Sequence, residues 1–172
     1  RSSSRRLTAR LNAIVRQRKQ RIQDFEGTMN TASEPRGRIV ETRKEGHRIL
    51  WTYVPEMPTA DVRSISPWLT VVRWEYDGSG NNGMPEADEN QRMLMLEDAL
   101  GRIERQSFFV EAYRRIGAGL REYVFYAADC DSFLAEFNSH VASHPRYPIE
   151  IKFYRDEAWS DLQGLINDFG AA

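Results

Sequence analysis

The most constraining feature of this sequence is the stretch from Gly119 to Leu162, in which strand-like and helix-like segments alternate and each change is marked by a cap or a proline. Residues 149–154 place apolar side chains at every second position, as a half-buried strand does. The segment before them repeats its apolar residues at helical spacing and is stopped by Pro145 and Pro148. The stretch therefore predicts the order strand, helix, strand, helix.

The residues before this stretch carry the same kinds of signal. Residues 68–76 follow a proline and are rich in β-branched and aromatic side chains, which indicates a strand. Residues 89–105 repeat their apolar positions at helical spacing, with Asp88 as the expected N-cap. A Gly-Ala-Gly loop separates two further strands, residues 108–116 and 121–127, and its length is typical of a hairpin.

The resulting order of elements predicts an α+β fold with a ferredoxin-like βαββαβ core. Residues 48–54 are expected to add an N-terminal edge strand, and a C-terminal helix that Asp156 caps follows the last strand. The two core helices cover one face of the sheet. Either the N-terminal or the C-terminal helix has the right size to cover the other face.

The sequence divides into three expected parts, namely residues 1–27 as a basic amphipathic helix, 28–47 as a polar linker and 48–172 as the α+β domain. The charged residues before Asp24 are all basic and sum to +8, which leaves −9 for the rest of a chain whose net charge is −1. A basic segment beside an acidic body favours either an anionic partner or packing of the segment on its own domain.

Several classes of protein are excluded or disfavoured. The one cysteine, Cys130, excludes an internal disulfide framework and zinc sites built from several thiolates. No apolar run reaches the length of a membrane span, and the basic start lacks the apolar segment of a secretory signal. These features favour a reducing, cytoplasmic setting.

Two patterns suggest chemistry but lack the context that the chemistry needs. Residues 78–83 match G-x-G-x-x-G, but the next helix begins too late for its N-terminal amides to meet a pyrophosphate. His140 and His144 have i, i+4 spacing, but no further group of ligands accompanies them, and both suit the last turn of a helix. The sequence therefore predicts no cofactor, no metal site and no catalytic residues.

Several aromatic and capping residues resemble a known family. The patterns Trp74-x-Tyr76, Arg121-Glu122-Tyr123 and Asp156-x-x-Trp159 are similar to the bacterial domain-of-unknown-function family 695, although the usual proline after the aspartate is missing here. The resemblance implies a small α+β domain with no assigned activity. It also implies a distant likeness in fold to regulator B, an inhibitor of ribonuclease E that acts by binding a protein.

The resemblance further implies a set of residues with family roles, most of them expected to be core aromatics or caps and tentative contacts for a partner. These residues are Trp74, Tyr76, Arg121, Tyr123, Tyr126, Asp156 and Trp159. We therefore expect a non-enzymatic domain that binds another protein as a regulator, adaptor or inhibitor in a bacterial cytoplasm.

The alternative is a nucleic-acid-binding module that uses the basic helix and an aromatic and basic face of the sheet. The basic residues of the helix are Arg10, Arg16, Arg18, Lys19 and Arg21, for which an anionic membrane surface is a further candidate partner. One register puts Phe109, Glu111, Tyr113 and Arg115 on a single sheet face with Glu150, Lys152 and Tyr154. Arg121 and Tyr123 are further candidates for the same face. The sequence leaves open whether this face is free or covered by a terminal helix.

Overall fold

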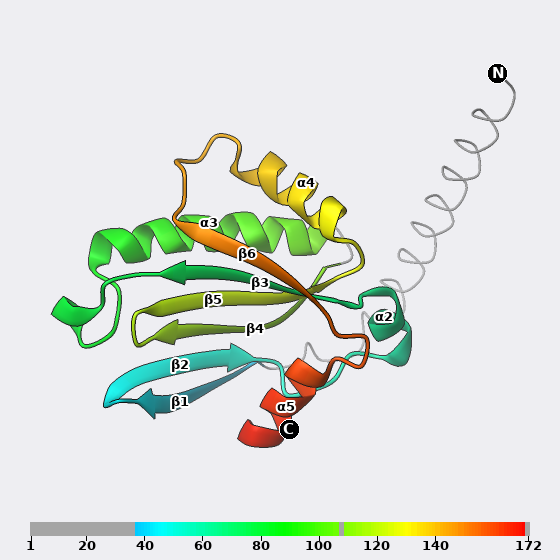
Figure 1. The fold of residues 1–172 in the computed structure, drawn as a ribbon, viewed down its shortest axis with the longest axis horizontal. Coiled ribbons are helices and arrows are strands. Elements are labelled where there is room, and N and C mark those ends of the chain that lie inside the picture. Colours follow the sequence, from blue (N-terminus) through cyan, green and yellow to red (C-terminus); the bar gives the residue numbers. More distant parts are fainter. Residues whose placement is uncertain (1–36, 107–108, 171–172) are drawn as a thin grey trace, which may run out of the picture. The chain divides into compact units, whose positions relative to one another are not determined.

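The fold is built on one antiparallel sheet. The computed structural model describes residues 37–106 and 109–170, so the expected basic helix lies outside the described residues. Within the described ranges, a six-stranded sheet has the order β1-β2-β4-β5-β3-β6 (Figure 1). Its strands are β1 (Arg38–Lys44), β2 (His47–Tyr53), β3 (Trp68–Glu75), β4 (Val110–Gly117), β5 (Leu120–Ala127) and β6 (Ile149–Arg155). Helices and antiparallel strands alternate, which confirms the predicted α+β class.

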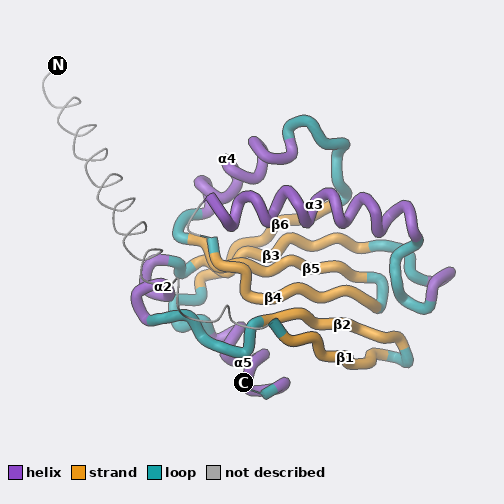
Figure 2. The backbone as a smooth tube through the Cα atoms, turned by 180° about the vertical axis from the view of Figure 1, so that it is seen from behind, coloured by secondary structure: helices purple, strands orange, loops and turns teal. Residues whose placement is uncertain are grey.

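The strands β3, β4, β5 and β6 have the predicted ferredoxin-like arrangement. β5 lies between β3 and β4, β3 lies between β5 and β6, and all neighbours are antiparallel. The helix α3 (Ala87–Gln106) connects β3 to β4, and α4 (Cys130–Val141) connects β5 to β6. Both helices pack on one face of the sheet, which we call the α3 face (Figure 2). In the described ranges, the helices lack the combination of length and apolar content that a membrane crossing requires.

The helix α3 buries one row of apolar side chains against the sheet. Met93, Leu96, Leu100 and Ile103 are at most 2 % exposed, as the helical spacing predicts. The predicted N-cap is wrong, because the helix begins at Ala87 and Asp88 lies inside its first turn. A carboxylate in this position still interacts favourably with the helix dipole.

An N-terminal hairpin extends the sheet beyond the core. The predicted strand at residues 48–54 is present as β2, but it is not the edge, because β1 pairs with its outer side. β1 lies within residues 28–47, so the expectation of a linker is wrong for this part. The turn that joins the two strands has Glu45 at φ 51° and Gly46 at φ 82°, the positive values that a type I′ turn requires.

The second face of the sheet, which we call the α5 face, is covered at one end. The helices α2 (Ala60–Ile65) and α5 (Ser160–Phe169) pack there, and Leu162 and Ile166 of α5 are buried against the strands. Trp159, just before α5, is fully buried and stacks on Tyr126, with ring centroids 3.7 Å apart. Of the two terminal helices proposed as covers, the C-terminal one is observed on this face.

We expect Trp159→Ala to lower the free energy of unfolding by about 3–5 kcal/mol, because it removes the buried ring that fixes the start of α5 on the sheet. The matched control is Tyr154→Ala on the same face, where the side chain is 49 % exposed. This control should change stability by no more than about 0.5 kcal/mol. Urea unfolding followed by circular dichroism measures both, and equal effects of the two substitutions would contradict the assignment.

Candidate functional site

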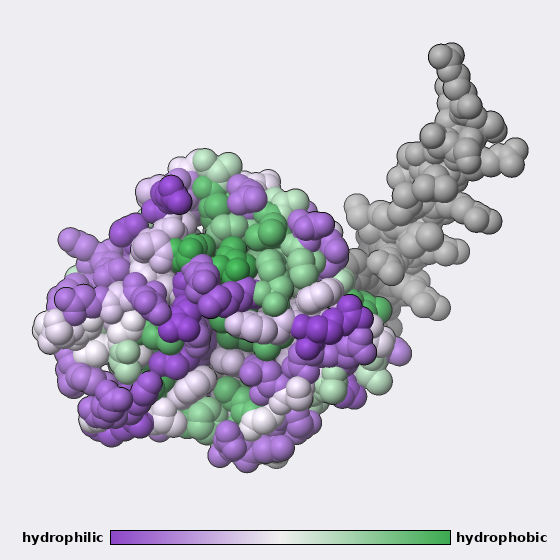
Figure 3. Space-filling model, viewed as in Figure 1, coloured by the Kyte–Doolittle hydropathy of each residue, from purple (hydrophilic) through white to green (hydrophobic). Residues whose placement is uncertain are grey.

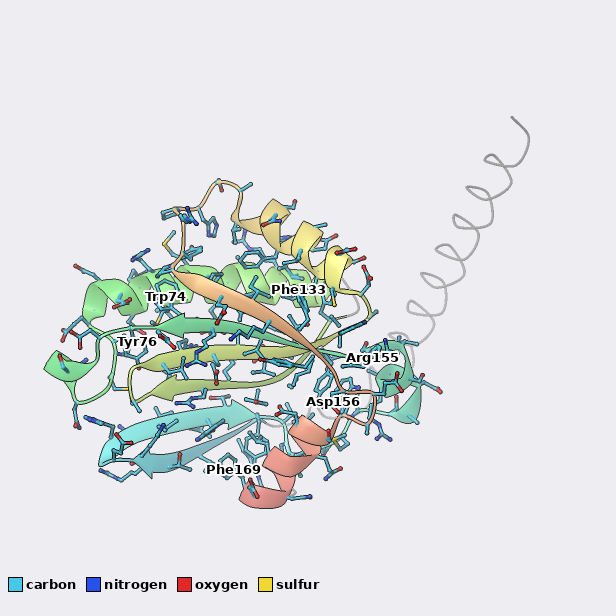
Figure 4. All side chains as sticks on the ribbon, viewed as in Figure 1. Trp74, Tyr76, Phe133, Arg155, Asp156 and Phe169 are labelled. Atoms are coloured by element: carbon cyan, nitrogen blue, oxygen red, sulfur yellow. The ribbon has the colours of Figure 1, made fainter. Side chains whose placement is uncertain are left out.

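The seven residues of the family pattern lie on opposite faces of the sheet and do not form one surface. The group on the α3 face comprises Trp74, Tyr76, Arg121 and Tyr123. The group on the α5 face comprises Tyr126, Asp156 and Trp159. Figure 4 labels Trp74 and Tyr76 near one end of the strands and Asp156 near the other end.

The aromatic residues of the first group bond to α3 and to the loop before it. The indole N–H of Trp74 donates to the carboxylate of Glu89 at 3.0 Å, and the hydroxyl of Tyr123 donates to a backbone carbonyl of α3 at 3.0 Å. The hydroxyl of Tyr76 donates to the carbonyl of Gly83 at 2.9 Å. These contacts hold the helix and its loop on the sheet, which is a structural role.

Arg121 belongs to a network of ion pairs between α3 and the sheet. The guanidinium groups of Arg121 and Arg114 both bond to the carboxylate of Glu97, and Arg114 also bonds to Glu111. The side chain of Arg121 is only 12 % exposed and lies over the ring of Tyr123 at 4.7 Å from its centroid. Arg121 is therefore engaged within the fold and does not offer its charge to a ligand.

The second group fixes the start of α5. The carboxylate of Asp156 accepts hydrogen bonds from the backbone N–H groups of Ser160 and Asp161 at 2.9 and 3.0 Å and from the hydroxyl of Tyr126 at 2.6 Å. Burial alone raises the pKa of Asp156, but the hydrogen bonds to its carboxylate outweigh burial and lower the pKa. Trp159 has a left-handed backbone with φ 56°, and its indole N–H donates to the carbonyl at the end of α2 at 3.0 Å.

The residue types that suggest chemistry are separated or occupied. The described residues hold no group of three or more side chains that could bind a metal ion. His140 Nδ1 lies 2.9 Å from the carbonyl oxygen of Glu136, whereas His144 Nδ1 lies 2.8 Å from the hydroxyl of Tyr147. Burial and two neighbouring carboxylates raise the pKa of the Cys130 thiol, which disfavours the thiolate that a nucleophile needs.

The G-x-G-x-x-G match forms a turn that closes on itself. The N–H of Gly83 donates to the carbonyl of Gly78 at 2.8 Å, and a Cβ added to Gly78 would lie 2.7 Å from the backbone of Gly83. The carbonyl of Gly83 also accepts the N–H of Gly119 at 3.1 Å. The absence of a side chain at Gly78 therefore allows a tight loop that is tied to the β4–β5 hairpin.

The open part of the α5 face carries a row of alternating charges. The register places Trp51, Arg115, Glu122, Arg73 and Glu150 side by side across β2, β4, β5, β3 and β6. Arg115 Nε lies 3.8 Å from a carboxylate oxygen of Glu122. Because each arginine has a glutamate as its neighbour in the row, the positive charge that attracts phosphate is cancelled locally. This row gives no support to the nucleic-acid alternative.

The register expected for this face is correct only in part. The residues that do lie on the α5 face are Tyr113, Arg115, Glu150, Lys152 and Tyr154. A bulge between Glu111 and Tyr113 shifts the register of β4, so Glu111 lies with Arg114 on the α3 face. The other residues found on the α3 face are Phe109, Arg121 and Tyr123.

The strand β6 forms an edge of the sheet, where half of its backbone groups have no strand partner. Among the described strands, β6 pairs with β3 alone. At the end of this ladder, the N–H of Asp156 donates to the carbonyl of Pro67 at 2.9 Å. Bonded and non-bonded residue pairs alternate in an antiparallel ladder, so every second residue counted back from Asp156 bonds to β3. The N–H and C=O groups of Ile149, Ile151 and Phe153 therefore point away from β3, toward the free edge.

The same three residues form an apolar strip beside α4. The side chains of Ile149, Ile151 and Phe153 pack against the core but stay partly exposed, as does Val141 at the end of α4. Figure 3 shows apolar side chains gathered between α4 and β6. An extended segment could thus bond to the edge and place its own apolar side chains on the strip. The sequence predicts the strand, but its place at the edge follows only from the strand order.

The capping role of Asp156 predicts a stability effect that depends on pH. Its folded-state pKa lies below the ordinary value of 3.8, so its stabilising contribution is present above that value and is lost as the pH falls through the lowered pKa. We expect Asp156→Asn to lower the free energy of unfolding by about 1–2 kcal/mol near neutral pH. The difference from the native protein should shrink toward about pH 2, and urea titrations across this range that show a constant difference would contradict the assignment.

Comparison with known proteins places the described core in a family. The model of a family described as "Family of unknown function (DUF695)" matches residues 43–164. No curated protein and no solved structure matches the chain, so the expected likeness to the ribonuclease E inhibitor is not shown. The matched range includes the ferredoxin-like core, the free edge of β6 and the Asp156–Trp159 pattern. The chain belongs to this family of unknown function, DUF695.

Proposed function

We propose that the described domain is a non-catalytic protein-binding module that takes up an extended segment of another protein along the free edge of β6. One observation carries this proposal, namely that backbone groups without a partner among the described strands and partly exposed apolar side chains coincide at Ile149, Ile151 and Phe153. In strand addition, main-chain hydrogen bonds supply affinity, and alternate side chains supply specificity.

The free energies of binding favour an interface that uses both the backbone groups and the apolar strip of this edge. The three edge residues offer about six backbone groups, each worth about 0.5–1.5 kcal/mol net when bonded. This sum of about 3–9 kcal/mol is similar to the cost of association, which is about 4–15 kcal/mol. Backbone pairing alone therefore gives weak binding. Burial of the apolar strip, at about 25 cal/mol per Å², supplies the remaining affinity.

The other edge of the described sheet is less suited to this function. Most side chains of β1 are exposed, and the strand carries Glu41 and Arg43, with Glu41 paired to Arg48 at 2.7 Å. Charged side chains along an edge strand oppose pairing with another chain. Ile39 is 72 % exposed, and its partner across the β1–β2 ladder is the polar Thr52. We therefore assign binding to β6.

A module of this kind acts as an adaptor, a regulator or an inhibitor, because it can hold a partner's segment without changing it chemically. The raised pKa of the Cys130 thiol and the separate partners of the two histidines fit a domain without catalysis. The single cysteine fits the reducing cytoplasm of a bacterium. The nucleic-acid alternative depends on the basic N-terminal residues and is decided by the experiment below.

A charge placed on the edge of β6 is expected to weaken binding of the partner's segment. Peptides selected from a random display library with the full chain should carry β-branched or aromatic residues at alternate positions. Ile151→Lys places a charge among the free edge groups and should weaken binding of a selected peptide by at least about tenfold. The matched control, Tyr154→Lys, changes a residue of the same strand whose backbone bonds to β3, and it should bind normally. Calorimetry measures the affinities, and circular dichroism verifies that both variants fold.

Two outcomes would overturn this proposal. One is equal binding by Ile151→Lys and the native chain, which would place the interface elsewhere. The other is material bound from native extract that disappears after nuclease treatment or after deletion of residues 1–26, combined with affinity that falls steeply with salt. That second result would favour nucleic acid as the partner.

A further inference from the structure

A hollow of about 310 Å³ lies where the chain enters β6, and it is basic although the body of the protein is acidic. Its lining residues are Arg92 on α3 and Arg146, Tyr147 and Pro148 in the loop that leads into Ile149. The two arginines are far apart in sequence, so only the fold brings their charges together.

The two guanidinium groups lack the carboxylate partners that most other arginines of the described chain have. Arg73, Arg115 and Arg121, for example, each lie within 4 Å of a glutamate carboxylate. No carboxylate of the described residues forms an ion pair with Arg92 or Arg146. A guanidinium has five N–H donors, and the one hydrogen bond that Arg92 makes leaves most of them free.

Two of the residues that line the hollow, Arg92 and Tyr147, are held in place by contacts within the fold. Arg92 donates to the carbonyl of Arg146 at 3.3 Å and lies over the ring of Trp74 at 5.3 Å from its centroid. Tyr147 is 7 % exposed, and its ring centroid lies 5.5 Å from that of Trp74. Its hydroxyl bonds to His144 at 2.8 Å. A ligand would therefore meet, at Arg92, a donor that needs little further ordering, whereas the exposed side chain of Arg146 would be ordered on binding.

We propose that this hollow binds a carboxylate carried by the segment that lies along β6, which rests on the function proposed above. A guanidinium fork matches a planar carboxylate in two parallel hydrogen bonds. A doubly charged phosphate fits less well, because Glu89 in the first turn of α3 holds its own carboxylate on the indole of the same Trp74. The carboxylate is either the C-terminus of the partner or an acidic side chain near the Ile149 end of the strand.

The test uses the full chain and begins with small probes that do not need the edge of β6. The indole N–H resonance of Trp74 reports on the hollow, because its ring lies under Arg92. Succinate should shift this resonance in a saturable manner, whereas the neutral succinamide should not. Arg92→Gln and Arg146→Gln should each weaken succinate binding by about tenfold or more, as expected for the loss of a hydrogen bond to a charged group. Arg102→Gln, an exposed arginine of the same helix outside the hollow, should leave it unchanged.

Experiments with variants of the selected peptide then identify the source of the carboxylate and separate this proposal from the preceding one. The selected peptide is made with a free C-terminus, with a C-terminal amide, and with amides in place of its acidic side chains. If replacing one of these carboxylates by an amide removes the effect of Arg92→Gln on peptide affinity, that carboxylate is the group bound in the hollow. Ile151→Lys should weaken peptide binding by at least about tenfold but preserve succinate binding, so a failure of the β6 edge is distinguished from a failure of the hollow. A missing succinate response, an equal loss in Arg102→Gln, or tighter binding of inorganic phosphate than of succinate would overturn the proposal.

Discussion

The described strands of the antiparallel sheet stop at β6, so the backbone groups on the outer side of this strand have no partner among the described residues. This constraint shapes the rest of the described domain. β3 uses both of its sides, because β5 and β6 flank it, whereas β6 pairs with β3 alone among the described strands. The outward groups belong to Ile149, Ile151 and Phe153, whose side chains pack below α4 and stay partly exposed. An open strand edge of this kind offers its N–H and C=O groups to a strand supplied by a partner.

The family residues hold the helices on the sheet that carries this edge and do not form the edge themselves. Trp74 and Tyr123 bond to α3 from the strands beneath it, and Asp156 ends the β3–β6 ladder while it caps α5. The stack of Trp159 on Tyr126 closes the opposite face. A binding edge gains affinity when it is ordered before the partner arrives, because less conformational entropy is lost on association. The residues of the family pattern would thus support binding indirectly, because they hold the helices and strands in place and do not contact the partner.

Much of the fold could be predicted from the sequence. A strand or helix that buries one face has apolar residues at regular spacing, and this spacing can be recognised in the sequence. β6 alternates cleanly, and α3 repeats its stripe. β1 could not be predicted in this way, since most of its side chains are exposed and its apolar residues do not alternate with polar ones. Only Glu45 and Gly46 indicate the turn that follows it. The candidate site was hidden for another reason. Neither the edge position of β6 nor the meeting of Arg92 with Arg146 exists before the chain is folded, so no local pattern encodes them.

Amide hydrogen exchange along β6 would show whether the outward backbone groups of this strand are free and are taken up by a peptide. In the free protein, the amides of Lys152 and Tyr154 should exchange slowly, because they bond to β3, whereas those of Ile151 and Phe153 should exchange rapidly. On addition of a bound peptide, the amides of Ile151 and Phe153 should become protected. Equal protection of all four amides in the free protein, or protection by the peptide that appears elsewhere and leaves Ile151 and Phe153 unchanged, would contradict the account.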